Sequence, residues 1–398
     1  MANNNENKIL NVPHLRFPEF SGEWVTKSIN DLAVVIGGGT PDTTVKSYWD
    51  GEIQWFTPSE IGKNKYVDSS LRTITEVGLN NSSAKLLPPN TILLSSRATI
   101  GECSLSLREC ATNQGFQCLV SKKCNVDFLY YLIQTKKKDL IRKSCGSTFL
   151  EISANEVRKI QVSVPSDVEQ QKIAELLSLI DERIATQNKI IEDLKKLKSA
   201  ISKQVFAQEP NGWCRLDTLF SKGKAGGTPT STNKEYYNGE IPFLSINDIT
   251  KQGKYVRYTE NHLSQSGLEN SSAWVVPKYS LIMSMYASVG LVTINEIPTT
   301  TSQAMFAMQL KDKGLLDYLY YYLSYFKYRY IHKYLETGTQ SNINADIVRG
   351  IMIPTYGHSR NMEISSTLQG IDVKIDNELS VLKLFNKQKN YLLSQMFI

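Results

Sequence analysis

The sequence contains two collinear copies of one unit, and this internal repeat constrains the fold more than any other feature. The tetrapeptide Gly-Gly-Thr-Pro at 38–41 recurs at 226–229, and Tyr-Trp-Asp-Gly-Glu-Ile at 48–53 recurs as Tyr-Tyr-Asn-Gly-Glu-Ile at 236–241. After one inserted residue the match continues through further pairs, which include Ser82-Ser83-Ala84 with Ser271-Ser272-Ala273, Thr112 with Thr301 and Gln114 with Gln303. The chain is therefore expected to fold as two versions of the same domain.

Each copy ends in a segment with the periodicity of a long amphipathic helix. Apolar residues alternate in steps of four and three, as they do along the seam of a coiled coil. The predicted seam residues are Ile173, Leu177, Ile180, Ile184, Ile191 and Leu194 in the first helix and Ile364, Leu368, Ile371, Ile375, Leu382 and Phe385 in the second. Polar interruptions fall at matching places, Gln187 with Glu378 and Lys198 with Lys389. This shared register favours two helices that pack on each other, although packing of each helix on its own domain alone is an alternative.

The segments outside these helices mix strand and helix patterns. Short apolar runs such as Ile53–Phe56, Thr91–Leu94, Gln117–Val120 and Leu281–Ser284 lie between turn residues, which is typical of strands. Phe128–Lys138 and Tyr318–Tyr328 read as helices. The predicted fold class is α+β, with a first domain at 1–167, a spacer helix at 168–207, a second domain at 208–362 and a second spacer helix at 363–398.

Composition describes an ordinary globular protein. The 398 residues suit two domains, and 41% are hydrophobic and 21% charged. No apolar run is long enough for a membrane span, and the polar N-terminus does not resemble a signal peptide, so a cytoplasmic location is expected. The net charge of +6 permits a nucleic-acid partner without requiring one. Six cysteines lack metal-ligand spacing, and we expect reduced thiols and no metal site.

The motifs of common enzyme classes are not found in repeated form. Gly-Gly-Thr-Pro does not continue as a phosphate-binding loop, and its proline favours a tight turn. The sequence has four histidines, and none occupies a matched position of the repeat, which excludes a duplicated histidine-dependent site. We also find no S-adenosylmethionine glycine motif and no aminomethyltransferase motif. No catalytic residues are therefore predicted.

Polar residues of the repeated loops are instead suited to reading DNA. Amides and guanidinium groups pair with base edges, whereas hydroxyls and lysines hold phosphates. The predicted contacts are Lys63, Asn64, Lys65, Arg97, Asn113 and Gln114 in the first copy and Lys251, Gln252, Lys254, Tyr286, Gln303 and Gln340 in the second. Each residue alone could equally belong to an exposed loop or cap a turn. As a set, polar contact residues recur in both copies, but the individual residues differ. This is expected of two domains that recognise different DNA sequences.

Several segments resemble the specificity subunits of Type I restriction-modification enzymes. The resemblance rests on Val12–Trp24 (VPHLRFPEFSGEW), the two repeated motifs above, Gly146-Ser147-Thr148-Phe149 before Ile152, and Glu-Gln-Gln-Lys-Ile-Ala at 169–174. The second copy departs from this pattern, because Gly338–Asn342 replaces Gly-Ser-Thr-Phe and the Glu-Gln-Gln opening is missing before the second helix, where Asn361-Met362-Glu363 stands. This puts the contacts that the C-terminal part makes with partners in doubt.

The resemblance implies a fold and a set of partners. It implies two target-recognition domains joined by antiparallel helices with pseudo-twofold symmetry, each domain reading half of an asymmetric, interrupted site on double-stranded DNA. Two modification subunits would methylate adenine using S-adenosylmethionine, and restriction subunits would use ATP and Mg²⁺. The specificity chain itself would be non-catalytic and hold no cofactor.

Two other functions remain open from the residues alone. The first is a coiled-coil adapter whose duplicated domains bind proteins, which predicts no sequence preference on duplex DNA. The second is a hidden nuclease, which predicts metal-dependent nicking by the purified chain.

Overall fold

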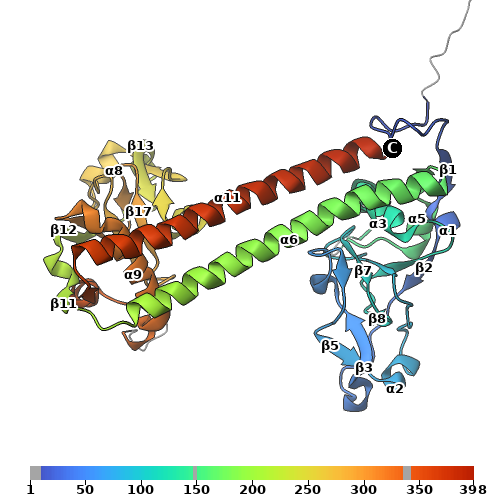
Figure 1. Ribbon diagram of the computed structural model, residues 1–398, viewed down its shortest axis with the longest axis horizontal. Coiled ribbons are helices and arrows are strands. Elements are labelled where there is room, and N and C mark those ends of the chain that lie inside the picture. Colours follow the sequence, from blue (N-terminus) through green and yellow to red (C-terminus); the bar gives the residue numbers. More distant parts are fainter. Residues whose placement is uncertain (1–9, 147–149, 335–341) are drawn as a thin grey trace, which may run out of the picture. The chain divides into compact units, whose positions relative to one another are not determined.

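A computed structural model describes residues 10–146, 150–334 and 342–398. Its contacts divide into two compact units. The first unit holds the residues up to Ile190 together with Leu379–Ile398, and the second holds Ile191–Glu378. Each unit thus combines one globular domain with part of each long helix (Figure 1). No helix within the described ranges is both long enough and apolar enough to cross a membrane.

The first unit is built on a sheet of five strands in the order β2-β9-β6-β7-β4, beside a three-stranded sheet in the order β5-β3-β8 and the antiparallel pair β1-β10. Its strands are β1 (Val25–Ser28), β2 (Ala33–Gly37), β3 (Trp49–Phe56), β4 (Tyr66–Val67), β5 (Arg72–Ile74), β6 (Ile92–Leu94), β7 (Cys103–Ser106), β8 (Cys110–Thr112), β9 (Gln117–Ser121) and β10 (Gln161–Val164). Its helices are α1 (Ile29–Leu32), α2 (Glu76–Asn80), α3 (Val126–Thr135), α4 (Lys137–Arg142), α5 (Ala154–Lys159) and the beginning of α6 (Asp167–Phe206).

The second unit repeats this topology strand for strand. Its sheets have the orders β12-β19-β16-β17-β14, β15-β13-β18 and β11-β20. The strands are β11 (Gly212–Arg215), β12 (Phe220–Ala225), β13 (Tyr237–Leu244), β14 (Tyr255–Val256), β15 (Asn261–Leu263), β16 (Leu281–Ser284), β17 (Val292–Asn295), β18 (Thr300–Thr301), β19 (Met305–Leu310) and β20 (Met352–Thr355). The helices are α7 (Ile246–Gln252), α8 (Gln265–Glu269), α9 (Leu316–Arg329), α10 (Ala345–Gly350) and the beginning of α11 (His358–Met396). The predicted α+β duplication is confirmed.

Side-chain caps determine where the short helices begin. Thr75 and Ser264 occupy equivalent positions before α2 and α8, and their hydroxyls accept from the backbone N–H of Gly78 and Gly267. Such caps satisfy N–H groups that have no partner inside the helix. The segment Phe128–Lys138, predicted as one helix, is divided at Lys136 into α3 and α4. The apolar pattern of the sequence alone could not locate this boundary.

The long helices begin close to the predicted limits, α6 at Asp167 and α11 five residues earlier than expected, at His358. All the predicted seam residues are buried or half-buried. The seam positions that carry charge in each helix are also covered, as described below.

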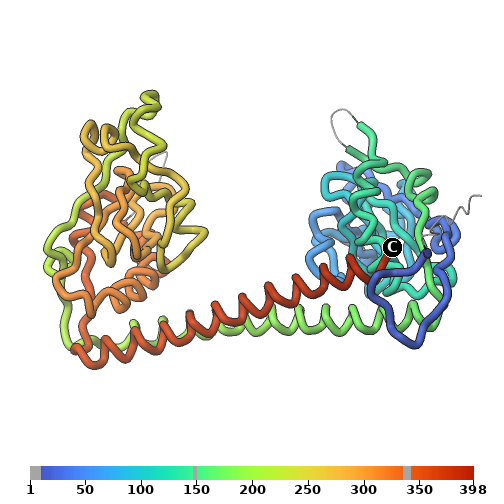
Figure 2. Tube along the Cα trace, turned by 90° about the horizontal axis from the view of Figure 1, so that it is seen from above, coloured from blue at the N-terminus to red at the C-terminus, as the bar shows by residue number. Residues whose placement is uncertain are grey.

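Each helix contributes to the core of both units. In the first unit, Ile173 and Leu177 of α6 share a core with Leu392 and Met396 of α11. In the second unit, the end of α6, at Phe206, shares a core with Ile364 and Leu368 from the beginning of α11. The helices are therefore antiparallel, and the alternative in which each packs on its own domain alone is wrong. Figure 2 shows the end of α11 beside the beginning of α6 in the first unit.

Candidate nucleic-acid interface

The repeated Gly-Gly-Thr-Pro segments are irregular and pack closely against backbone. A Cβ atom on Gly38 would lie 2.0 Å from the carbonyl oxygen of Asn113, and one on Gly226 would lie 1.9 Å from that of Thr301. Gly39 and Gly227 donate backbone hydrogen bonds to the carbonyls of Thr112 and Thr301 at 2.8 and 2.9 Å. Glycine is required here because no larger residue fits, and this close packing favours a structural role over a phosphate-binding loop.

The repeated Ser-Ser-Ala motif packs against the same Gly-Gly-Thr-Pro segment in each domain. A Cβ atom on Gly39 would lie 2.2 Å from the hydroxyl of Ser83, and one on Gly227 would lie 2.2 Å from that of Ser272. The Gly-Gly-Thr-Pro, Ser-Ser-Ala and Thr-x-Gln motifs, which are well separated in the sequence, therefore lie together in each domain.

Two predicted contact residues, Gln114 and Gln303, are hydrogen-bonded to these segments. The Thr40 hydroxyl donates to the amide oxygen of Gln114, and the Thr228 hydroxyl donates to that of Gln303. Both glutamines are exposed. The bond orients each amide and uses only its carbonyl, so the NH₂ group keeps the donors that adenine N7 requires.

The loops that follow β6 and β16 lie next to these glutamines. Ser96 N–H donates to the Gly115 carbonyl at 2.8 Å, and Met285 N–H donates to the Ala304 carbonyl at 2.7 Å. Each loop then bends through an alanine in the left-handed region, Ala98 at φ 54° and Ala287 at φ 57°. Such a conformation is uncommon for alanine, and its recurrence indicates that the loop shape is a fixed part of the domain.

This bend carries Arg97 in the first unit and Tyr286 in the second. Arg97 forms an ion pair with Glu151 at 2.8 Å, and both side chains are partly exposed. Tyr286 is 40% exposed. The chain segment after α4 or α9 returns to the same loop, since Ile152 N–H donates to Ser96 O and Ile343 N–H donates to Met285 O. The predicted contact Gln340 lies outside the described residues, as do Ser147 and Thr148.

Asn113 has a local role as well. Its side-chain oxygen accepts from Gly115 N–H at 2.8 Å, which closes the turn before β9. Arg97, Asn113 and Gln114 are thus brought together in the first unit, and Tyr286 and Gln303 in the second. We call these two sets of residues the reading surfaces.

The loops at 63–65 and 251–254 lie elsewhere, beside the long helices. Lys65 has a side chain only 6% exposed, paired with Asp127, and Lys254 has one only 10% exposed, paired with Asp317. Both ammonium groups are covered and already paired with a carboxylate, so the structure does not add these two lysines to the surface described above. Sequence pattern indicated a basic polar loop but could not show which surface covers it.

The other predicted contacts in these two loops lie in different surroundings. Lys63 and Asn64 are exposed and line a cavity of about 430 Å³ against α6 and α11. Lys251 forms an ion pair with Glu260 on the surface. Gln252 is held by its own turn, because its amide donates to the Tyr258 carbonyl and accepts from Arg257 N–H, both at 2.8 Å. These four residues are not part of the reading surfaces.

Lys137, the first residue of α4, and Lys327, near the end of α9, were not among the predicted contacts. Lys137 and Lys327 pack beside Gly101 and Gly290, the last residues of the two bent loops. Tyr328, one residue further, is strongly exposed. In the sequence, these residues were visible only as basic and aromatic residues toward the end of each predicted helix. Their position beside the bent loop depends on the fold.

Among the described residues, no metal centre is found at these surfaces. The described ranges contain no group of three or more His, Cys, Asp or Glu side chains that could hold a metal ion. All six cysteines have free thiols. Burial raises the pKa of the Cys103, Cys110 and Cys118 thiols to about 12, which makes them poor nucleophiles.

Fold and site define a class of protein in which two copies of one α+β domain, each with a polar reading surface, are carried by two antiparallel helices. The family model for the Type I restriction modification DNA specificity domain matches this chain twice, at residues 21–196 and 210–382. The chain belongs to this family.

Curated relatives and solved structures agree with this assignment. The MjaIX specificity subunit of Methanocaldococcus jannaschii is 34% identical over 58% of this chain and 59% of its own length. The EcoR124I/EcoR124II specificity subunit of Escherichia coli is 31% identical over 46% of each chain. The chain thus spans roughly half of these relatives. A crystal structure of the Type I S subunit from M. genitalium has a TM-score of 0.58 at 16% identity, over 97% of this chain and 99% of that one.

A further structure, from a study of complex assembly and conformational transition of the Type I system, has a TM-score of 0.62 at 15% identity over 95% of this chain and 98% of that one. At such low identities these structures show a shared fold. They are consistent with the tandem domains and long helices described above.

Proposed function

We propose that this chain is the non-catalytic, DNA-reading subunit of a Type I restriction-modification system. Each domain reads one half of an asymmetric, gapped site on double-stranded DNA. The observation that supports this most is the duplicated reading surface, in which two backbone frames with matching hydrogen bonds to the glutamine turn present Arg97 in one unit and Tyr286 in the other. A common frame with different contact residues suits two readers of two different sequences.

Partner subunits supply the chemistry in this proposal. Two modification subunits bring S-adenosylmethionine, and restriction subunits bring ATP and Mg²⁺, while this chain holds no cofactor. Access to chromosomal DNA places the complex in the cytoplasm.

Outward-facing apolar residues on the long helices support a role in binding partners. Val168, Leu179 and Ile190 of α6 are exposed and follow one another at eleven-residue steps, as do Met362, Val373 and Leu384 of α11. Eleven residues make about three turns, so each set lies along one face of its helix. Exposed apolar stripes of this kind typically mark protein interfaces.

The experiment that tests DNA reading compares two arginines of the first domain. Arg97→Ala removes a guanidinium from the reading surface, whereas Arg108→Ala removes one that pairs with Asp68 on the surface at 2.6 Å. In complex with the modification subunit, the Arg97 variant is expected to lose roughly tenfold or more in affinity for the specific site, at the scale of one bidentate base contact. The measurement is a fluorescence titration of specific against scrambled duplex at fixed salt.

The Arg108 variant controls for general loss of positive charge and is expected to bind as the unmodified chain does. Equal affinity of the unmodified chain for specific and scrambled duplexes would contradict the proposal and favour the protein-adapter function.

A further inference from the structure

A covered charged cluster ties the first domain to both long helices. The Lys65 ammonium lies 2.6 Å from the Asp127 carboxylate on α3 and donates to the Ser178 hydroxyl on α6 at 2.7 Å. The Tyr131 hydroxyl, also on α3, donates to the Asp181 carboxylate on α6 at 2.7 Å. A single cluster therefore joins a loop of the domain, a helix of the domain and the first spacer helix.

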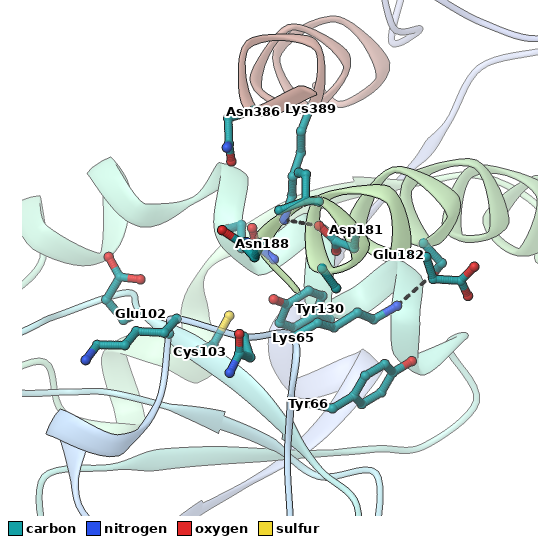
Figure 3. A pocket seen from close by; sticks show the side chains of 17 residues that line it. Lys65, Tyr66, Glu102, Cys103, Tyr130, Asp181, Glu182, Asn188, Asn386 and Lys389 are labelled. Carbon is teal, nitrogen blue, oxygen red and sulfur yellow. Dashed lines mark hydrogen bonds and ion pairs between the residues drawn. The ribbon is translucent and has the colours of Figure 1, made fainter. Parts of the chain in front are cut away.

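The second spacer helix joins the same cluster. Lys389 of α11 forms an ion pair with Asp181 of α6 at 2.8 Å, and both side chains are largely covered. Figure 3 shows the two side chains pointing toward each other, with Lys65 nearby on the domain side. Lys389 is one of the polar residues that interrupt the apolar seam. We call Lys65, Asp127, Tyr131, Asp181 and Lys389 the first interlock.

The second unit contains the same arrangement. Lys254 lies 2.7 Å from Asp317, the Tyr321 hydroxyl donates to Asp372 of α11 at 2.7 Å, and Lys198 of α6 pairs with Asp372 at 2.5 Å. These residues, the second interlock, occupy the repeat positions of the first, with the roles of α6 and α11 exchanged. Lys198 is the matching polar interruption of the seam.

Burial makes these contacts sensitive to the loss of one member. Burial raises the pKa of the Tyr131 and Tyr321 hydroxyls, so they remain protonated donors to the aspartates. Burial also lowers the pKa of Lys254, and the nearby Asp317 opposes that shift. Removing one partner of such a group leaves the other charge covered and uncompensated, which costs more than breaking an exposed pair.

Apolar seam contacts alone do not choose one register. Leucine and isoleucine side chains pack comparably after a shift of one heptad, because the attraction between them is not directional. The same shift would carry Lys198 and Lys389 away from Asp372 and Asp181. A polar residue at a single seam position is known to select register at some cost in stability. The charged residues of the interlocks can select the register of the helix pair in this way. They also join that register to the position of each domain on the helices.

Building on the proposed function, we propose that the two interlocks determine which gap between half-sites the protein accepts. Each interlock fixes the register of the helix pair and the seat of one reading domain on that pair. Neither touches the reading surfaces, so the interlocks act on gap length and leave the reading of each half-site unchanged. Their members are positioning residues.

The test uses the full chain in complex with its modification subunit and a set of duplexes that carry both half-sites with the native gap or one base pair more or less. Lys198→Met removes the cross-helix charge while keeping the length of the side chain. The ratio of affinities for native and altered gaps is expected to fall roughly tenfold, the scale of coupling between close charge pairs. Methylation of each half-site in the native duplex should persist.

A matched control lies two residues away on the same helix. Lys196 pairs with Glu192 at 2.7 Å, and both side chains are well exposed, so Lys196→Met is expected to leave the ratio unchanged. The exchanged pair Lys198→Asp with Asp372→Lys is expected to restore discrimination between gaps. A wild-type ratio in Lys198→Met would overturn the inference, as would an equal loss in the Lys196 control.

A milder variant covers the case in which Lys198→Met does not fold. Tyr321→Phe removes one hydroxyl and keeps the ring, and reduced gap discrimination is again expected, while an unchanged ratio contradicts the inference. Failure of the proposed function is distinguishable, because the unmodified chain would then show no preference for any gapped site. If the unmodified chain does prefer one gap and the variants keep the same ratio, only the interlock inference fails.

Discussion

Single residues explain where the two copies diverge. Glu169 opens α6 as a buried acid that accepts from Arg16 at 2.8 Å and from the indole of Trp24 at 3.3 Å. In the second copy the matching position is Arg360, and the matching tryptophan, Trp213, is 54% exposed where Trp24 is 3% exposed. Without a covered indole to accept from, an acid has no role there. The missing Glu-Gln-Gln motif therefore reflects a different local packing and leaves the helix intact.

Buried thiols give a prediction at the same scale. Burial raises the pKa of Cys110 to about 12 from an ordinary value of 9.0, so the folded state keeps a proton that the unfolded state loses above pH 9. Stability from this thiol is full below pH 9 and is lost as the pH rises toward 12. Cys110→Ala should reduce the slope of unfolding free energy against pH by up to about 1.4 kcal/mol per pH unit in this window.

Urea titrations at several pH values with a reductant present measure this slope. Cys145→Ala serves as the control, because it removes an exposed thiol and leaves the buried thiols in place. A slope that Cys110→Ala does not alter would show that the thiol is not shielded from water.

Among the elements, each long helix has two faces that differ in their side chains. One side carries the seam and the interlocks, and the other carries the exposed apolar stripe of Val168, Leu179 and Ile190 on α6. We predict that Leu179→Glu weakens binding of the modification subunit at least roughly tenfold, because a carboxylate would have to be desolvated in the interface. Size-exclusion chromatography and calorimetry of the complex measure the loss.

Gln171→Glu introduces the same group at another exposed position of α6, in place of a side chain that is already polar, and it should bind the partner as the unmodified chain does. Normal partner affinity in Leu179→Glu would show that the partner contacts another face.

Elements differ in how far sequence could predict them. The sequence period predicts the seam positions of α6 and α11, but it would be the same for a parallel and an antiparallel helix pair. The antiparallel direction is shown by the structure, because Phe206 at the end of α6 and Ile364 near the beginning of α11 share one core. The duplication of sheets follows from the repeat. What the sequence could not show is that Gly38, Ser83 and Gln114 meet, because contacts between distant loops depend on the folded sheets. The interlocks were visible only as polar interruptions of an apolar seam.

At the scale of the whole molecule, base reading and domain positioning are assigned to different residues. The reading surfaces around Gln114 and Gln303 are assigned to base recognition, and the interlocks on α6 and α11 to the gap. The separation predicts that half-site sequence and gap length change independently. An adapter with duplicated domains would give neither property on DNA.

The most direct test of the DNA-reading assignment is methylome sequencing of a host that expresses this chain together with its modification subunit, compared with the same host without the chain. The account predicts adenine methylation at one asymmetric motif in two parts, separated by a fixed gap, only when the chain is present. An unchanged methylome despite a stable complex of the two proteins would contradict the assignment.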